Sequence, residues 1–290
     1  MRKSNFTVAG HTFSVATSDI DITAMLPNLK PFTTEDGDAP LFSITIDNSL
    51  IPSWRGNRIG SFPCPSATFE VYRQESGAYC ILISNEFGIP CAFFRSDAER
   101  KNFTLTTRGT EDEQIFGMNN ALMVIYTICT APHHTLMVHS SVVENSGKGF
   151  MFFGQSGRGK STHSDLWVRH IGGSTLINDD NPVIRIAEDG TPYVYGSPWS
   201  GKRPVYKNVS YPIAGMAAIE QAPENRIRRE STPNAFGIML SSCSTLKFDK
   251  KIHMDICGTI TKVLERIPVH TLSCRPDKEA AEVSSNAFGI

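Results

Sequence analysis

The stretch GQSGRGKST, residues 154 to 162, has the residue types and the spacing of a phosphate-binding loop. It satisfies the pattern G-x-x-x-x-G-K-[ST], in which glycines let successive backbone N–H groups point inward around an anion. A helix that begins near Lys160 would add the positive end of its dipole to this nest. Lys160 would then reach the β- and γ-phosphates, and the Ser161 hydroxyl would ligate Mg²⁺.

A flexible Gly/Ser turn is the alternative interpretation of this stretch. An apolar segment typical of a strand precedes it and a helical pattern follows, which is the setting of a nucleotide-binding loop. We therefore predict that ATP and Mg²⁺ bind here. The residues expected to hold the phosphates are Gly154, Gln155, Ser156, Gly157, Arg158, Gly159, Lys160, Ser161 and Thr162.

Two adjacent acids, Asp179 and Asp180, follow the predicted strand STLIN. In phosphoryl-transfer sites one carboxylate typically holds Mg²⁺ and another accepts the proton of the nucleophile. Adjacent like charges repel, so we expect a bound cation or a raised pKa at this pair. The composition Asp-Asp-Asn-Pro also suits a solvated turn. After a phosphate loop the site is favoured, with Ser161 and Asp180 as metal ligands and either acid as the base.

Three further residues could take part in the chemistry. His139 opens the segment HSSVV and could tune proton transfer by bonding to an acid or a phosphate, although it could equally be a satisfied core histidine. Lys202 and Arg203 end the turn SPWSGKR and could neutralise charge on a transferred phosphate. Trp199 in that turn could stack on a base or anchor the loop, and the alternative is an ordinary surface loop with a buried tryptophan.

The residues around these candidates predict hairpins and helices that would position them. Thr110 and Glu113 form a capping box before a helix that Pro132 ends. The segments LMVHSSVVE and GFMFFG flank the turn NSGK as a hairpin that leads into the glycine loop, and STHSDLWVRHI predicts the helix after it. VIRIA and YVYG predict another hairpin, and KIHMDICGTITKVLERI predicts a helix with one apolar side.

The length of 290 residues suits one large domain or two modest ones. Residues 1–108 predict a β-rich N-terminal subdomain in which we find no catalytic constellation. Residues 109–290 predict an α/β domain in which hairpins, rather than βαβ units, surround the glycine loop. The sheet of this domain is therefore expected to be mixed.

The net charge and the cysteine content limit the partners and the cellular compartment that are expected for this protein. A net charge of -1 gives no long-range attraction to nucleic acid or to an anionic membrane, and the basic run NRIRRE is expected to be a solvated face. Seven cysteines, an odd number without a CxxC motif, predict reduced thiols. We see no secretory h-region and no run near the roughly 18 apolar residues that cross a bilayer. These observations predict a soluble cytoplasmic protein.

The region from His139 to about Ile186 resembles the core shared by HPr kinase/phosphorylase and phosphoenolpyruvate carboxykinase. In both, a histidine-bearing strand pairs with the strand that leads into a P-loop, and an Asp-Asp pair ends the next strand. SPWSGK and VHTLSCRPDKEAAEV are similar to uncharacterised HPr-kinase-like proteins. The resemblance implies a mixed-sheet P-loop kinase core, in which one of Asp179 and Asp180 is the general base towards a substrate hydroxyl and His139 lies against the pair.

The sequence also departs from both enzymes. The Leu-Glu-x-Arg-Gly-type signature of HPr kinase, with its metal-binding glutamate, is replaced by YVYGSPWSGKR, so neither the HPr partner nor the reverse phosphorylase reaction is implied. The lysine, histidine and arginine that a carboxykinase uses are not found. By analogy with HPr kinase, a homo-oligomer is the assembly that the resemblance implies.

These observations predict an ATP-dependent kinase acting on a hydroxyl, with serine of a protein or peptide as the favoured acceptor. Two alternatives stay open. One is a nucleotide-binding regulatory module without transfer chemistry, and the other is a small-molecule kinase that shares the same site. Loss of activity with retained nucleotide binding in Asp179 and Asp180 variants would separate a kinase from the module.

Overall fold

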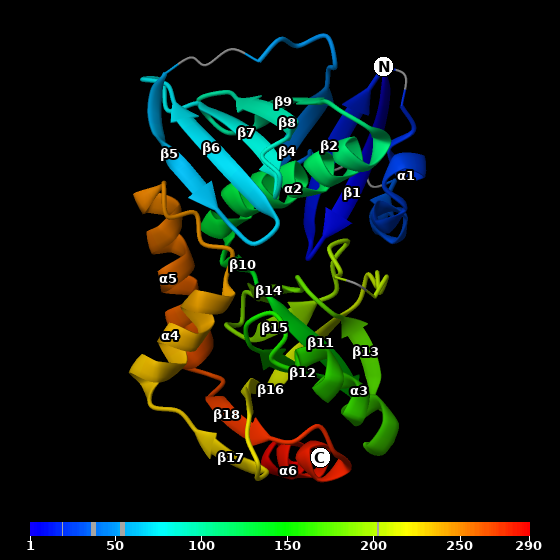
Figure 1. Ribbon diagram of the computed structural model, residues 1–290, viewed down its shortest axis with the longest axis vertical. Coiled ribbons are helices and arrows are strands. Elements are labelled where there is room, and N and C mark those ends of the chain that lie inside the picture. The colour runs from blue at the N-terminus through cyan, green and yellow to red at the C-terminus, as the bar shows by residue number, and fades with distance from the viewer. Residues whose placement is uncertain (19, 36–38, 53–55, 202) are drawn as a thin grey trace. The chain divides into compact units, whose positions relative to one another are not determined.

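The computed structural model describes the chain except residues 19, 36–38, 53–55 and 202 (Figure 1). The protein is a mixed α/β protein with two large mixed sheets. Its chain divides into two compact units. Unit 1 contains Met1–Thr130 and Lys247–Lys250, and unit 2 contains Ala131–Leu246 and Lys251–Ile290.

Unit 1 is built on a sheet of nine strands among its described residues, in the order β3-β1-β2-β4-β9-β8-β7-β6-β5. Most neighbours are antiparallel, whereas β4 runs parallel to both β2 and β9. The strands are β1 (Arg2–Val8), β2 (His11–Thr17), β3 (Thr33–Thr34), β4 (Phe42–Ile46), β5 (Asn57–Pro63), β6 (Ala67–Arg73), β7 (Tyr79–Asn85), β8 (Pro90–Ser96) and β9 (Asn102–Thr107). A short helix α1 (Ile22–Met25) and a 3₁₀ turn (Pro27–Phe32) follow β2. The β-rich character predicted for residues 1–108 is confirmed.

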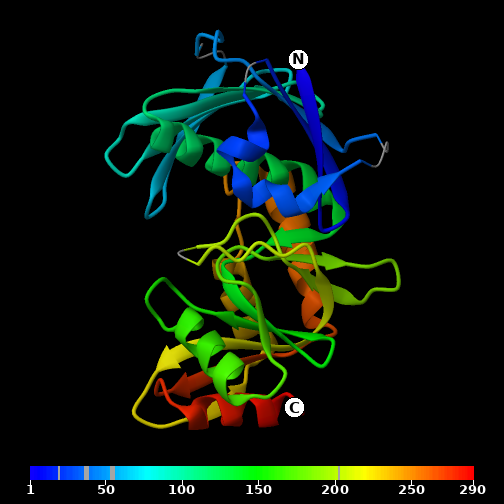
Figure 2. The same ribbon diagram turned by 90° about the vertical axis from the view of Figure 1, so that its right-hand side faces the viewer.

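Helix α2 (Glu111–Thr130) packs across β7, β8 and β9 of unit 1 (Figure 2). Its predicted capping box is confirmed, because the Thr110 backbone N–H donates to the Glu113 carboxylate at 2.7 Å. Gly117 permits the close approach, since a Cβ there would lie 2.7 Å from the carbonyl oxygen of Cys91. The compact unit therefore extends to Thr130, whereas the sequence suggested a boundary at residue 108.

The segment Glu111–His133 is the one described helical stretch long and apolar enough to meet the length and composition test for a membrane span. The sequence by itself predicts no such run. In the structure 67% of its apolar window is buried inside the protein, as in the core helix of a soluble protein. By itself the test is therefore weak support for a membrane span.

Residues Lys247–Lys250 join unit 1 through a buried polar contact. Asp249 accepts a hydrogen bond from the hydroxyl of Tyr79 and forms an ion pair with Arg100 at 3.1 Å. The Arg100 guanidinium also lies 4.9 Å from the centre of the Tyr79 ring. The hydrogen bond from Tyr79 and the ion pair with Arg100 offset the free-energy cost of burying the Asp249 carboxylate. The contact between Arg100 and the Tyr79 ring holds these two partners together.

Unit 2 holds a second sheet of nine strands among the described residues, in which β10-β14-β15-β16-β12-β11-β13 form one path and β18 and β17 continue from β16. The strands are β10 (Thr135–Met137), β11 (Ser140–Asn145), β12 (Lys148–Phe153), β13 (Thr175–Asn178), β14 (Val183–Ile186), β15 (Pro192–Tyr195), β16 (Ser210–Gln221), β17 (Arg226–Arg229) and β18 (Val269–Cys274). The hairpins β11–β12 and β14–β15 confirm the two predicted around the glycine loop. The segment LMVHSSVVE, predicted as one strand, is divided into β10, which pairs with β14, and β11, and His139 lies between them. β12 also pairs in parallel with β16, so the sheet is mixed, as expected.

Helices cover this sheet because its central strand is apolar on both faces: Phe150, Met151, Phe152 and Phe153 of β12 are all fully buried. The helices are α3 (Lys160–His170), α4 (Thr232–Ser242), α5 (Lys250–Leu264) and α6 (Lys278–Ala287), with a 3₁₀ turn at Ala131–His133. On one face, Trp167 of α3 packs with Phe150 and donates to the Ser284 hydroxyl of α6 at 2.8 Å. The apolar side predicted for α5 is confirmed by the burial of Ile252, Ile256, Ile260 and Val263. The basic run 225–230 contains the edge strand β17, whose arginines are exposed.

Candidate active site

The glycine loop connects β12 to α3 and is shaped by glycine backbone angles. Gly157 has φ 81° and Gly159 has φ 103°, a left-handed region that other residues rarely adopt. Gly159 is the N-cap of α3 and supplies no side chain to cap the helix, so the first-turn N–H groups keep their donor capacity for a ligand. The strand–loop–helix setting predicted from the sequence is present.

Lys160 begins α3, and its side chain folds back over the loop and is buried. Its Nζ donates to the carbonyl oxygen of Gly154 at 2.7 Å and lies 2.9 Å from Nε2 of His139. Burial lowers the pKa of Lys160, while the charges of Asp180 and Asp179 oppose that shift. The ammonium group therefore stands between the loop and the acid pair.

His139 bridges Lys160 and Asp180. Its Nδ1 lies 2.8 Å from Oδ1 of Asp180, and its Nε2 faces Lys160. Because the lysine ammonium can only donate, Nε2 accepts and the ring proton sits on Nδ1, from which it is donated to the carboxylate. The His139 backbone N–H is held by the carbonyl of Ser242 at 2.7 Å. The structure thus places His139 against the acid pair, as the resemblance implies.

Asp180 is the more accessible of the two acids, with a side chain 31% exposed. Besides His139, its Oδ2 accepts from the Asn181 amide at 2.8 Å, and its backbone N–H donates to the Asn178 side chain at 2.9 Å. This carboxylate is oriented by neighbours on several sides yet remains open to solvent. A molecule in solution can therefore reach it.

Asp179 points into the protein, with a side chain only 4% exposed. Its Oδ1 accepts from the Ser141 hydroxyl at 2.7 Å, and that hydroxyl accepts from the Ser164 hydroxyl at 2.6 Å. Its Oδ2 accepts from Nε of Arg203 at 2.6 Å. Burial acts to raise the pKa of Asp179, but the bonds from Arg203 and Ser141, the charge of Arg203 and a bond from Ser161 outweigh it and lower the pKa.

This result decides between the two outcomes expected for adjacent acids. The sequence predicted either a bound cation or a raised pKa at the pair. For Asp179 the pKa is lowered, because a cation is supplied by the chain itself in the form of Arg203. Arg203 also forms an ion pair with Asp165 through Nη1 and donates to the Ser161 carbonyl at 3.3 Å. Lys202, its predicted partner, lies outside the described residues.

The turn that carries Arg203 packs on the acid pair. The carbonyl of Trp199 accepts from the Asn181 backbone N–H and from the Asn178 amide, each at 3.2 Å. A Cβ at Gly201 would lie 3.2 Å from Cβ of Asp180. Trp199 itself is 5% exposed, so it anchors the turn and is not presented to a base. The burial of Trp199 agrees with the alternative of a surface loop with a buried tryptophan, whereas the contacts to Asn178 and Asn181 place the turn beside the acid pair.

Three residues of the site were not singled out in the sequence. Asp165 lies four positions after Ser161 on α3, which puts both on one helix face, and Ser141 lies two positions after His139, the period of a strand face. Ser164 completes the set by its bond to Ser141. These spacings could have indicated the residues, but only once His139 and Ser161 were accepted as part of one site.

Oxygen donors suited to Mg²⁺ gather at Ser161 and Asp179. Among the described residues no group of three or more His, Cys, Asp or Glu side chains could hold a metal alone. Mg²⁺, however, usually takes one or two protein oxygens and completes its shell with water and substrate phosphates. The Ser161 side chain contributes to the lowered pKa of Asp179, and the sequence pairs Ser161 with Asp180 as metal ligands. Ser161 and the two neighbouring aspartates supply oxygen donors of the kind that Mg²⁺ takes.

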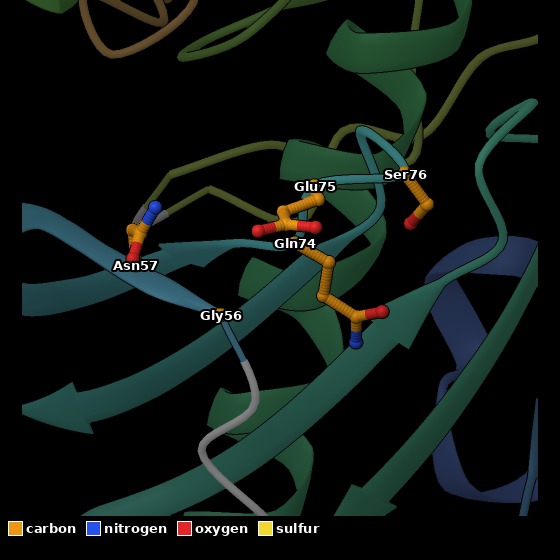
Figure 3. Close-up of a pocket in the computed structure, with 5 residues that line it drawn as sticks. All are labelled: Gly56, Asn57, Gln74, Glu75 and Ser76. Atoms are coloured by element: carbon orange, nitrogen blue, oxygen red, sulfur yellow. The ribbon is translucent and has the colours of Figure 1, made fainter.

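Elsewhere the described chain has shallow hollows that contain none of these residues. One, of about 390 Å³, lies in unit 1 and is lined from β5 and the β6–β7 turn (Figure 3). Another, of about 410 Å³, lies beside Glu230 and α4 in unit 2. The predicted site residues thus sit apart from both hollows.

Comparison with known proteins adds no assignment: no protein-family model matches the chain, and no curated protein matches it.

Proposed function

We propose that this protein is an ATP-dependent kinase that transfers the γ-phosphoryl group to a hydroxyl, with serine of a protein or peptide as the acceptor. The observation that carries the proposal is the contact series from Lys160 through His139 to Asp180, at 2.9 and 2.8 Å, beside a glycine loop at a helix N-terminus. A nest for phosphate and an oriented carboxylate thus lie next to one another. These are the two parts that phosphoryl transfer requires.

The nucleotide would be held by the loop and by Lys160. The backbone N–H groups of residues 154–162 and the start of α3 favour a polyphosphate, because several donors and the helix dipole act on one anion. Lys160 now donates to loop carbonyls, at 2.7 Å to Gly154 and 3.4 Å to Gln155. On nucleotide binding its ammonium would exchange these carbonyls for charged phosphate oxygens, which are stronger acceptors. Bound Mg²⁺ would supply neutralisation of the phosphate charge, held by Ser161 and Asp179.

Asp180 would act as the general base. It is reachable from solvent, and the Nδ1–H of His139 fixes one of its oxygens. The acceptor hydroxyl loses its proton to Asp180 as its oxygen bonds to the γ-phosphorus, and the bond from that phosphorus to the bridging oxygen of ADP breaks. Lys160 and the loop amides stabilise the charge that develops on the leaving phosphate.

The choice of acceptor and of family rests on the resemblance to HPr kinase/phosphorylase and phosphoenolpyruvate carboxykinase. We propose a P-loop kinase core of that type for unit 2, supported by the β11–β12 hairpin that leads into the loop and by the placement of His139 against Asp180. We also propose a cytoplasmic location without a nucleic-acid or membrane partner, supported by seven free cysteine thiols and a near-neutral charge.

The test is transfer of labelled γ-phosphate from ATP into a host lysate, with binding of a fluorescent ADP analogue measured in parallel. Lys160→Ala should lose at least about a hundredfold in transfer, because it removes the charge that meets the phosphates. Lys148→Ala is the matched control, since Lys148 is an exposed lysine at the far end of β12. A folded Lys160→Ala protein with full activity would refute the kinase, and ADP binding without transfer to any acceptor would favour a regulatory module.

A further inference from the structure

The Arg203 guanidinium lies among three oxygen acceptors. Its three guanidinium nitrogens are directed to Asp179, to Asp165 and to the carbonyl of Ser161. Two of these acceptors are carboxylates. The guanidinium therefore neutralises the carboxylate assigned above to Mg²⁺.

Asp179 has little capacity left for a metal while Arg203 is bound. One of its oxygens is committed to Ser141 at 2.7 Å and the other to Arg203 at 2.6 Å. The Arg203 side chain is 29% exposed, whereas that of Asp179 is 4% exposed. The Ser141 hydroxyl is fully buried and held by Ser164, whereas the Arg203 side chain is partly exposed, so we take Arg203 as the donor that can leave.

We propose that Arg203 is an exchangeable resident cation, which holds Asp179 until a divalent ion replaces it and which then turns to the phosphates. This inference rests on the proposed function, because the divalent ion is the one that accompanies the nucleotide. It assigns Arg203 and Asp165 as positioning residues: Asp165 keeps the guanidinium next to the site after Asp179 is released. The turn at 197–203 is thereby coupled to metal loading.

The physical basis is competition between two cations for one carboxylate. Charge-assisted bonds from a forked guanidinium are among the stronger side-chain contacts, and the bond to Asp179 must be broken before the metal can bind that carboxylate. Removing Arg203 should therefore strengthen metal binding. A merely structural arginine predicts the opposite, because its loss would disorder Asp179 and weaken binding.

The first experiment measures binding of Mn²⁺ alone to the purified full-length protein, without nucleotide. We expect Arg203→Gln to bind Mn²⁺ about tenfold more tightly than the unmodified protein. Arg203→Lys should lie between the two, because a lysine keeps the charge but cannot contact three acceptors. Arg169→Gln is the matched control, an exposed arginine in the last turn of the same helix α3, and should leave Mn²⁺ affinity within about twofold.

The second experiment asks whether the turn moves when the metal binds. Peptides that cover residues 197–206 should exchange their backbone hydrogens faster when Mg²⁺ saturates the unmodified protein, and at one fast rate with or without Mg²⁺ in Arg203→Gln. Both results are required. Unchanged or weaker Mn²⁺ binding by Arg203→Gln, no Mn²⁺ binding by either protein, or unchanged exchange on adding Mg²⁺ would each overturn the inference.

Binding of the fluorescent ADP analogue keeps this inference separate from the proposed function. If the unmodified protein binds the analogue and Arg203→Gln fails the Mn²⁺ test, only the role of Arg203 is refuted. If the analogue does not bind at all, the proposed kinase fails, and the Mn²⁺ ranking still decides whether Arg203 and a metal compete for Asp179.

Discussion

His139 and Asp180 form a fixed pair, with Nδ1 of the histidine 2.8 Å from Oδ1 of the aspartate. The opposite ring nitrogen faces Lys160 at 2.9 Å, so a single imidazole joins the loop lysine to the proposed base. This relationship favours Asp180 over Asp179 as the proposed base. The Asp179 carboxylate is held instead by Ser141 and Arg203.

Replacing His139 should affect catalysis more than binding. His139→Ala removes the donor that orients Asp180, so we expect kcat to fall by about 10²-fold or more while the affinity for ADP changes only a few-fold. His139→Gln, whose amide can still donate to Asp180, should recover part of the loss. Steady-state rates and ADP titration check this, and an unchanged kcat in His139→Ala would contradict the assigned role.

Replacing each of the two acids by its amide should impair different properties of the protein. Asp180→Asn removes the base, and we expect transfer to be lost while metal-nucleotide binding stays. Asp179→Asn removes a metal oxygen, and we expect the Mg²⁺ concentration for half-maximal activity to rise. Kinetics over a range of Mg²⁺ concentrations distinguish the variants. Identical behaviour of both would show that the roles are not divided as proposed.

Ser141→Ala should destabilise the protein in a pH-dependent way. It removes a hydrogen bond to the buried Asp179, which costs about 1–3 kcal/mol. Because the folded pKa of Asp179 is lowered, its stabilisation is complete above the unfolded pKa of about 4 and is lost as pH falls through the folded pKa. Urea unfolding should show the full difference from the unmodified protein at pH 7 and a smaller one near pH 3.5. A difference that stays constant with pH would argue against ionised Asp179.

Gly201→Ala should impair the site with little effect on stability. The added Cβ would lie 3.2 Å from Cβ and 3.4 Å from Cγ of Asp180, so the turn or the acid must shift by a few tenths of an ångström. Such a shift in a base is expected to lower kcat several-fold. Gly258→Ala is the control, because a Cβ added at this helical glycine would meet open space. Alanine there should stabilise the folded protein by up to about 1 kcal/mol. Equal kcat in both variants would exclude close packing of the turn on Asp180.

Tyr79→Phe should destabilise unit 1. The Tyr79 hydroxyl is buried and donates to Asp249, which also forms an ion pair with Arg100. Loss of that donor should cost about 1–3 kcal/mol, since the carboxylate stays buried with fewer bonds. The measurement is the urea midpoint, and an unchanged midpoint would show that this contact does not hold Lys247–Lys250 in place.

Local sequence signals predicted much of the fold. The capping box at Thr110 and Glu113, the apolar side of α5 and the hairpins on both sides of the glycine loop are all present. The boundary between the two units was harder to predict from the sequence, because α2 packs through Gly117 onto strands that precede it in the chain. Helix α4 and the long strand β16 were not predicted, since neither carries a strong period of apolar residues.

The sequence by itself determined the glycine loop and the two acids after a strand, because such features depend on backbone preferences within a few neighbouring residues. Only the tertiary structure decided that Asp179 faces Arg203, 24 positions away, and that Arg203 reaches Asp165 across 38 positions. Contacts at that separation depend on the register of the sheet and the path of the turn over it. Neither is encoded in local spacing, so the division of roles between Asp179 and Asp180 appears only when the chain is folded.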